Sequence, residues 1–144
     1  MKTLRLVCAL LTALLTVSRL AAAGAPSALV PRYEKISAAL VADDLAGATA
    51  AARQLAAAAG QSHETAIAAS SQTVARAGNL AAAREAFKTL SRDLIALARH
   101  EKGYFIVNCP MANADWLQSN RKIANPYFGQ AMSACGSVTE ETKG

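Results

Sequence analysis

The sequence predicts an all-α protein, an antiparallel bundle of about four helices followed by an irregular segment rich in cysteine, methionine and aromatic residues. Alanine, the residue with the highest helix propensity, dominates residues 38–98. Capping residues and glycines divide this stretch into segments of helical length. One of these segments also has large apolar residues spaced three and four apart, which is typical of an amphipathic helix.

Residues 1–23 are predicted to be a signal peptide. Lys2 and Arg5 precede a short apolar run over residues 6–17, and small residues near position 23 supply a cleavage pattern. The apolar run is too short to span a bilayer comfortably. We therefore expect an exported protein, periplasmic or secreted, with no membrane span once the signal peptide is removed.

The rest of the chain is predicted to be a linker, residues 24–31, and a single helical domain, residues 32–144, whose motif segment is 104–136. The formal net charge is +5, but three of the basic residues lie in the predicted signal peptide. No basic stripe with interleaved aromatic residues follows. The composition therefore gives no support to binding of nucleic acid.

Each predicted helix is bounded by residues that favour helix ends, with Asp, Ser or Asn before the helix or Gly after it. The expected ranges are 33–42, 44–59 (after Asp43 and before Gly60), 63–77 (after Ser62 and before Gly78) and 80–99 (after Asn79). The last helix has the clearest apolar stripe. Its basic residues, Arg84, Lys88 and Arg92, fall on the other side and are expected to face solvent.

The segment after residue 103 has a different character. Residues 104–107 are β-prone, but no clear partner strand accompanies them. Asn125 and Pro126 fit a helix start, which predicts a short helix over 126–135 that ends at Gly136. The polar residues 137–144 are expected to be frayed.

Both cysteines of the expected mature protein lie in this segment, and each has a methionine close by. Cys109 and Met111 are two apart around Pro110, so an extended backbone would place them on one face. Met132 and Cys135 are three apart, so a helical turn would do the same. Thiolates and thioethers select soft metals, and the four sulfurs together predict a Cu(I) site.

The two thiols are expected to differ in acidity. If Pro110 opens a helical turn, Cys109 lies at its N-terminus, where the helix dipole lowers a thiol pKa. Cys135 would lie at a helix C-terminus, where the dipole raises it. On this hypothesis Cys109 is the first ligand to contact a metal.

A Cys109–Cys135 disulfide is the alternative, because an even number of cysteines in an exported protein is typical of disulfides. Such a bond would stabilise the domain by roughly 3 kcal/mol. His63 is a reserve metal ligand, although a lone histidine is more often a surface or capping residue. No catalytic triad, carboxylate pair or phosphate-binding loop is present. We therefore do not expect an enzyme.

The chain resembles a bacterial envelope domain of unknown function over most of its length after about Val30. That family occurs as small exported proteins and fused to the periplasmic adaptor (membrane fusion) subunits of copper/silver RND efflux pumps. The resemblance rests mainly on Cys109-Pro-Met-Ala, Trp116-Leu-Gln, Asn125-Pro-Tyr-Phe-Gly, Met132 and Cys135-Gly, together with Leu80-Ala-Ala-Ala-Arg-Glu-Ala-Phe. It implies copper handling in the periplasm, with Cys109, Met111, Met132 and Cys135 as the positions that carry over. The adaptor's hairpin and barrel regions are absent from the sequence, so the chain is not an adaptor by itself.

The sequence thus predicts a periplasmic protein that binds Cu(I) and sequesters it or passes it to an efflux or metal-handling partner. The alternative is a non-enzymatic interaction module of the envelope, stapled by the Cys109–Cys135 disulfide.

Overall fold

The structure of the protein is a computed structural model that describes residues 28–144. The predicted signal peptide and the first residues of the predicted linker lie outside this range. The elements in chain order are α1 (Val30–Val41), α2 (Leu45–Gln61), α3 (Thr65–Ala75), α4 (Leu80–Ala98), β1 (Lys102–Cys109), β2 (Ala114–Gln118), the 3₁₀ turn η2 (Gly129–Met132) and β3 (Ser137–Lys143). Because α1 begins at Val30, the last residues assigned to the linker belong to this helix.

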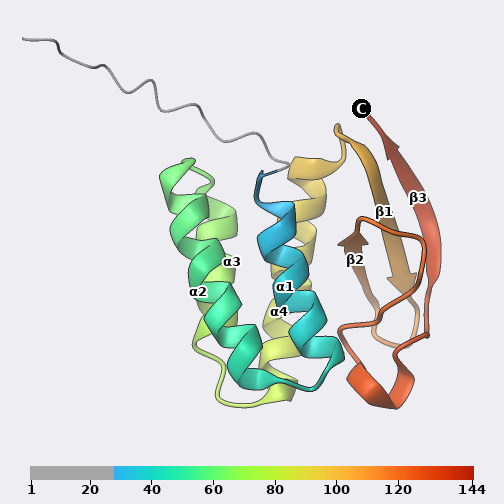
Figure 1. Ribbon diagram of the computed structural model, residues 1–144, viewed down its shortest axis with the longest axis horizontal. Helices are drawn as coiled ribbons and strands as arrows, with labels where there is room; N and C mark the ends of the chain where they lie inside the picture. Colours follow the sequence, from blue (N-terminus) through green and yellow to red (C-terminus); the bar gives the residue numbers. More distant parts are fainter. Residues whose placement is uncertain (1–27) are drawn as a thin grey trace, which may run out of the picture.

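The protein is a mixed α and β structure, so the all-α prediction was wrong. Four antiparallel helices form two layers, α2 with α3 and α1 with α4, and a three-stranded antiparallel sheet covers the outer side of the second layer (Figure 1). The sheet is built entirely from the segment that was expected to be irregular. Among residues 28–144, no helix combines the length and the apolar composition that a membrane crossing requires.

The four predicted helices are confirmed, with ends shifted by a few residues. Asp43 adopts a left-handed conformation (φ 58°) that ends α1, and Asp44 caps α2 instead by accepting a hydrogen bond of 2.9 Å from the Gly47 amide. His63 (φ 63°) occupies the equivalent place after α2. Each turn thus contains one residue in the left-handed region. In the first turn it is Asp43, the predicted N-cap, and in the second it is His63, three residues after the glycine predicted to end the helix.

The sheet has the order β2–β1–β3, with β1 in the centre. Val107 of β1 faces Trp116 of β2 and Val138 of β3, and the register with β3 shifts between Ile106 and Val107. Thr139 donates to the Ile106 carbonyl at this irregularity, at 3.2 Å. The polar residues predicted to fray are therefore the third strand.

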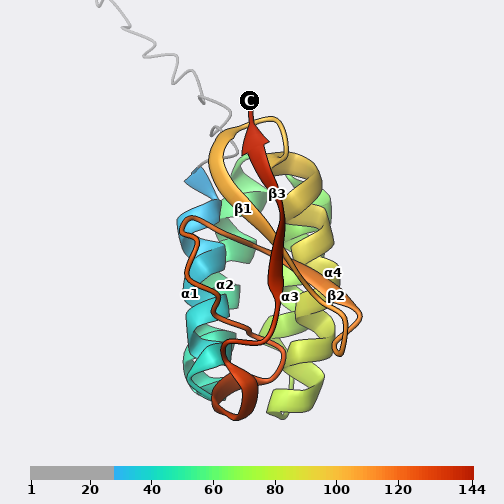
Figure 2. The ribbon, with the colours of Figure 1, turned by 90° about the vertical axis from the view of Figure 1, so that its right-hand side faces the viewer.

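The sheet meets the helices through the outer edge of β2, and β3 is the strand farthest from them (Figures 1 and 2). Side chains supply the hydrogen bonds along that edge. The Leu117 amide donates to the Tyr33 hydroxyl at 3.2 Å, and the Ser119 amide donates to Glu34 at 2.6 Å. Two side chains of α1 thus supply hydrogen-bond partners for one amide of β2 and for one just after it.

A row of aromatic rings joins the layers. Tyr33 stacks on Phe87 with centroids 4.9 Å apart, Phe87 contacts Tyr127 at 6.0 Å, and Tyr127 meets Trp116 edge-on at 5.9 Å. The hydroxyls of Tyr33 and Tyr127 both bond to Ser91 of α4, at 2.8 and 3.2 Å. All five side chains are buried, so this row fixes the loop after β2 onto the helices.

Candidate functional site

The structure brings the two cysteines of the described residues into contact. The Sγ atoms of Cys109 and Cys135 lie 3.5 Å apart, and both cysteines are free thiols. Cys109 is the last residue of β1, and Cys135 lies in the turn that leads into β3. Because β1 and β3 are neighbours in the sheet, their pairing brings together two residues that are distant in sequence.

Cys109 is fixed by the turn that follows β1. The Ala112 amide donates to the Cys109 carbonyl at 3.2 Å, and the Asn113 amide donates to the Pro110 carbonyl at 3.1 Å. Pro110 therefore opens a tight turn between two strands, and the predicted helical turn was wrong. The side chain of Cys109 is fully buried.

Cys135 lies at the end of an irregular segment. The helix predicted over 126–135 is reduced to the single 3₁₀ turn of η2, and the Cys135 amide donates to the Met132 carbonyl at 3.1 Å just after it. Gly136 follows with a φ of 139°, and a Cβ there would lie 2.7 Å from the Trp116 ring. A glycine is needed at this point so that the chain can pass over the indole. Cys135 itself is half-buried, so it is the more accessible thiol.

Asn125 connects the loop to the turn that carries Cys135. Its side-chain amide donates to the Cys135 carbonyl at 2.7 Å, and its own backbone amide donates to the Ser133 carbonyl at 2.7 Å. Its side-chain oxygen accepts from the amides of Tyr127 at 2.8 Å and Phe128 at 3.3 Å. Asn125 is fully buried, so these bonds replace its contacts with water.

The two thiols have different acidities. Burial raises the pKa of Cys109, but hydrogen bonds from the Ala112 amide, the Cys135 thiol and the Asn125 side chain outweigh it and leave this pKa below the usual value. The pKa of Cys135 is raised, first by its hydrogen bond to Cys109 and then by burial and by the charge of Cys109. The direction agrees with the expectation for each thiol. The causes are burial, local hydrogen bonds and, for Cys135, the charge of Cys109.

The two thiols also differ in accessibility. Cys109 has the lowered pKa, but it is buried, whereas Cys135 is partly exposed. Cys135 is therefore the thiol that is more open to a reagent in solution. That Cys109 is the first ligand to contact a metal stays a prediction.

The two predicted thioether ligands are the exposed large hydrophobic side chains of the described residues. Met111 is 66% exposed and Met132 is 36% exposed. Met111 lies in the turn after β1 and lines a groove of about 360 Å³ against α4, together with Arg84, Lys88 and Phe128. Met132 ends η2, three residues before Cys135. The thiol pair is therefore flanked in sequence by two methionines whose side chains are available to solvent.

His63 lies far from this pair. It is in the α2–α3 turn, at the end of the bundle opposite to the end of β1 that carries Cys109 (Figure 1). Within residues 28–144, no three side chains of the types His, Cys, Asp and Glu gather closely enough to hold a metal.

The spacing of the two sulfurs fits a shared metal ion. Metal–thiolate bonds are about 2.3 Å long in zinc sites, so one ion can reach two sulfurs that lie 3.5 Å apart. The lowered pKa of Cys109 favours the deprotonated form, which is the form that binds metals. The same distance also allows the two thiols to be oxidised to a disulfide after a small movement.

The sequence did not predict two residues that support the site, Asn125 and Arg84. It predicted Asn125 to be a helix cap and Arg84 to be part of a solvated face. Instead, Arg84 Nε donates to the Pro126 carbonyl at 3.1 Å, and its guanidinium also bonds to Leu40 and Asp43. The Asn-Pro pair could have suggested an Asx turn, whereas nothing local distinguishes Arg84 from Lys88 or Arg92.

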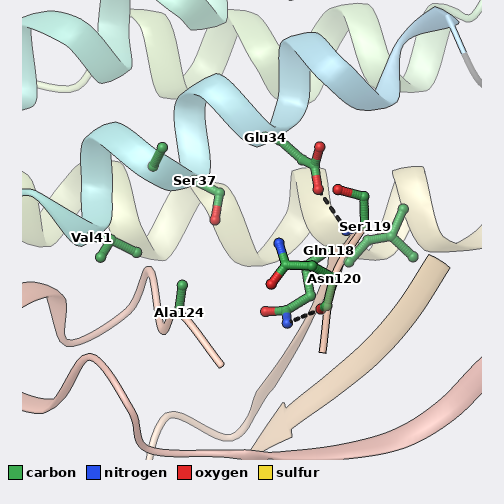
Figure 3. A pocket seen from close by; sticks show the side chains of 9 residues that line it. Glu34, Ser37, Val41, Gln118, Ser119, Asn120 and Ala124 are labelled. Atoms are coloured by element: carbon green, nitrogen blue, oxygen red, sulfur yellow. Dashed lines mark hydrogen bonds between the residues drawn. The ribbon is translucent and has the colours of Figure 1, made fainter. Parts of the chain in front are cut away.

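A separate hollow lies between α1 and the segment after β2 (Figure 3). It has a volume of about 340 Å³ and is lined by residues that include Glu34, Ser37, Gln118, Ser119 and Asn120. Its one carboxylate, Glu34, already accepts from the Ser119 amide. No cysteine, methionine or histidine lines it, so it is distinct from the predicted sulfur site.

Comparison with known proteins adds one relationship. No curated protein and no solved structure matches the chain. A family model described as "Protein of unknown function (DUF3347)" matches residues 29–103, which is just over half of the 144 residues. The match contains all four helices and ends at the start of β1, so both cysteines lie beyond it. The chain belongs to the DUF3347 family.

Proposed function

We propose that this protein is exported to the periplasm, binds Cu(I) through Cys109 and Cys135, and sequesters the ion or passes it to an efflux or metal-handling partner. The observation that carries the proposal is the contact between the two thiols, whose Sγ atoms lie 3.5 Å apart at the junction of two segments. One of the two has a lowered pKa, which favours a thiolate at lower pH.

The chemistry of the donors favours copper over other metals. Two thiolates with methionines nearby are soft ligands, and Cu(I) is the soft ion of the first transition row. Zinc sites in proteins use cysteine, histidine and carboxylate, and the described residues offer no third group of these types beside the pair. Met111 and Met132 are exposed and lie two and three residues from the cysteines, so they are the thioethers that would join the pair at the ion.

The location and the partner rest on the sequence. The predicted signal peptide supports export, and the resemblance to a domain that is also fused to copper/silver efflux adaptors supports a role beside such a pump. In this role the protein is not an enzyme, because it moves an ion without transforming a substrate.

The test is an anaerobic titration of the reduced protein with Cu(I) against a chromophoric chelator. We expect one Cu(I) per chain to move to the wild type, and both Cys109→Ser and Cys135→Ser to lose it. Ser119→Ala, an exposed change away from the pair, is the control and should bind as the wild type does. Stoichiometric binding by the double variant Cys109→Ser/Cys135→Ser would refute the assignment.

A second candidate is supported by the same contact. Thiols at 3.5 Å can instead form a structural disulfide, which would staple the C-terminal segment of an interaction module. Counting free thiols in protein taken directly from the periplasm separates the two. Two free thiols favour the metal site, and none, in a protein that takes up no Cu(I) until reduced, favours the staple.

A further inference from the structure

Asn125 is the one fully buried amide side chain of the described residues, and it forms hydrogen bonds in two directions. Its oxygen accepts from the backbone amides of Tyr127 and Phe128, at 2.8 and 3.3 Å. Its nitrogen donates to the Cys135 carbonyl at 2.7 Å, and the side chain also hydrogen-bonds the Cys109 thiol. The acceptor side therefore fixes the orientation of the amide, and the donor side acts on the segment that carries the exposed thiol.

The acceptor side is held rigidly. The Tyr127 hydroxyl donates to the Asp115 carbonyl at 2.5 Å and is also hydrogen-bonded to the Ser91 hydroxyl at 3.2 Å, which ties the 125–128 turn to β2 and α4. Arg84 donates to the Pro126 carbonyl at 3.1 Å from the same helix. The turn is thus fixed to the core from two sides. Its amides therefore orient the Asn125 side chain without any contribution from Cys135.

The donor side joins a segment with few other constraints. Between η2 and β3, the Cys135 amide bonds within its own segment to Met132 at 3.1 Å, and two bonds join the segment to Asn125: the backbone bond to Ser133 at 2.7 Å and the side-chain bond to Cys135. Ala134 is exposed, and Cys135 is half-buried. Without the side-chain bond, the Cys135 carbonyl would lose the hydrogen bond that fixes it to the 125–128 turn.

We propose that Asn125 is the positioning residue of the thiol pair: its side-chain amide holds the Cys135 backbone so that the two sulfurs stay in contact. The inference takes the pair as the functional site, as the proposed function does, but it does not require copper. It assigns to the Asn-Pro-Tyr-Phe turn the task of keeping two distant segments in register at the site.

The test measures how readily the two thiols join. One glutathione disulfide oxidises the Cys109 and Cys135 thiols to one protein disulfide and yields two molecules of reduced glutathione. The equilibrium constant of this exchange reports the effective concentration of one thiol at the other. The exported protein is purified with its natural sequence, and the constant is measured by trapping thiols in glutathione buffers.

Asn125→Asp is the informative variant. Asp keeps an oxygen for the Tyr127 and Phe128 amides but cannot donate to the Cys135 carbonyl. We expect the equilibrium constant to fall by about tenfold or more, the size expected when a buried hydrogen bond is lost. Asn120→Asp makes the same chemical change at an exposed residue, where the side-chain oxygen accepts from the Lys122 amide, and it should leave the constant unchanged. A folded Asn125→Asp protein with the wild-type constant would overturn the proposal.

A measurement on the wild type covers the case in which the variant does not fold. The side-chain NH₂ protons of Asn125 should exchange with solvent at least about tenfold more slowly than those of Asn120, because the first are buried and bonded. Equal exchange rates would show that the bond does not persist, and the proposal would fail.

The two proposals fail separately. If the wild type takes up no Cu(I) but Asn125→Asp lowers the exchange constant, the copper assignment is lost and the positioning role stands. If the wild type binds Cu(I) and the folded variant keeps the wild-type exchange constant, the positioning role is lost and the copper assignment stands.

Discussion

At the scale of single residues, two tyrosines are placed where their ionisation is costly. Tyr33 and Tyr127 are buried, and each bonds to Ser91. Burial is the main reason that the pKa of each lies well above the usual value. A raised pKa in the folded state stabilises the fold below the unfolded pKa of about 10, and this stabilisation is lost as the pH rises beyond that value.

This leads to a prediction about alkaline stability. Above pH 10 the free energy of unfolding of the wild type should fall by up to about 1.4 kcal/mol per pH unit for each of these tyrosines. In Tyr127→Phe the slope should be smaller by one tyrosine's share. Urea unfolding at several pH values between 8 and 11.5 measures both slopes, and the two curves should run parallel below pH 9. Equal slopes above pH 10 would contradict the assignment.

At the scale of elements, Arg84 joins the helices to the segment that supports the site. Its guanidinium bonds to the Leu40 carbonyl at 3.0 Å and to Asp43 in the α1–α2 turn, and its Nε reaches Pro126. Gly129 lies so close to Arg84 and Asp43 that a side chain at this position would collide with both. The end of α1, the start of α4 and η2 are therefore locked together.

Replacing Arg84 should loosen this junction. Arg84→Met keeps much of the apolar stem but removes all the donors, so we expect a loss of about 2 to 3 kcal/mol in the free energy of unfolding. Arg92→Met is the matched control on the same helix, because Arg92 is exposed and bonds only to Thr89 at 3.1 Å. Its effect should stay within about 0.5 kcal/mol. Denaturant titration compares the two, and equal effects would show that the junction is not important.

The helices were predictable from sequence and the sheet was not, for a physical reason. Alanine content, capping residues and the 3.6-residue period are local signals, and they identified all four helices. The strand β3 is polar, Ser137–Lys143, and β2 has only five residues, so neither carries the apolar alternation that marks a half-buried strand. Both strands pair with β1, so their formation depends on residues that are distant in sequence.

The site divides in the same way. The sequence identified Cys109 and Cys135, but it grouped each with its neighbouring methionine by local geometry. The structure brings the two cysteines into contact, as both the four-sulfur site and the disulfide require, but it leaves Met111 on the surface of a turn. The supporting bonds of Asn125 also cross between segments, so the spacing of residues could not reveal them.

At the scale of the whole molecule, the sheet completes the core of the helices. Tyr33 and Phe87 are fully buried, and the groups that cover them include β2 and Tyr127. The family match ends at residue 103, before β2 and the loop begin. The family match thus covers the four helices, and the segment that follows the match covers their aromatic face.

A chain cut after Gly103 should therefore not behave as an independent domain. We expect helical far-UV circular dichroism with weak near-UV signals, binding of a hydrophobic dye and a broad thermal transition, because the aromatic face is uncovered. The full-length protein should unfold in one sharp transition. A truncated chain with an equally sharp transition and no dye binding would show that the helices form a complete core alone.

The attachment of β2 to α1 also has a consequence for the order of folding. The bond between the Leu117 amide and Tyr33 spans 84 residues, whereas the helices form from contacts between neighbouring segments. Long-range pairing is slow, because a long loop must close before it is stabilised. During the interval in which helices have formed and the sheet has not, Cys109 and Cys135 are separate and solvated. A reagent that meets the chain during this interval therefore encounters two independent thiols, and only a folded chain presents them as one pair.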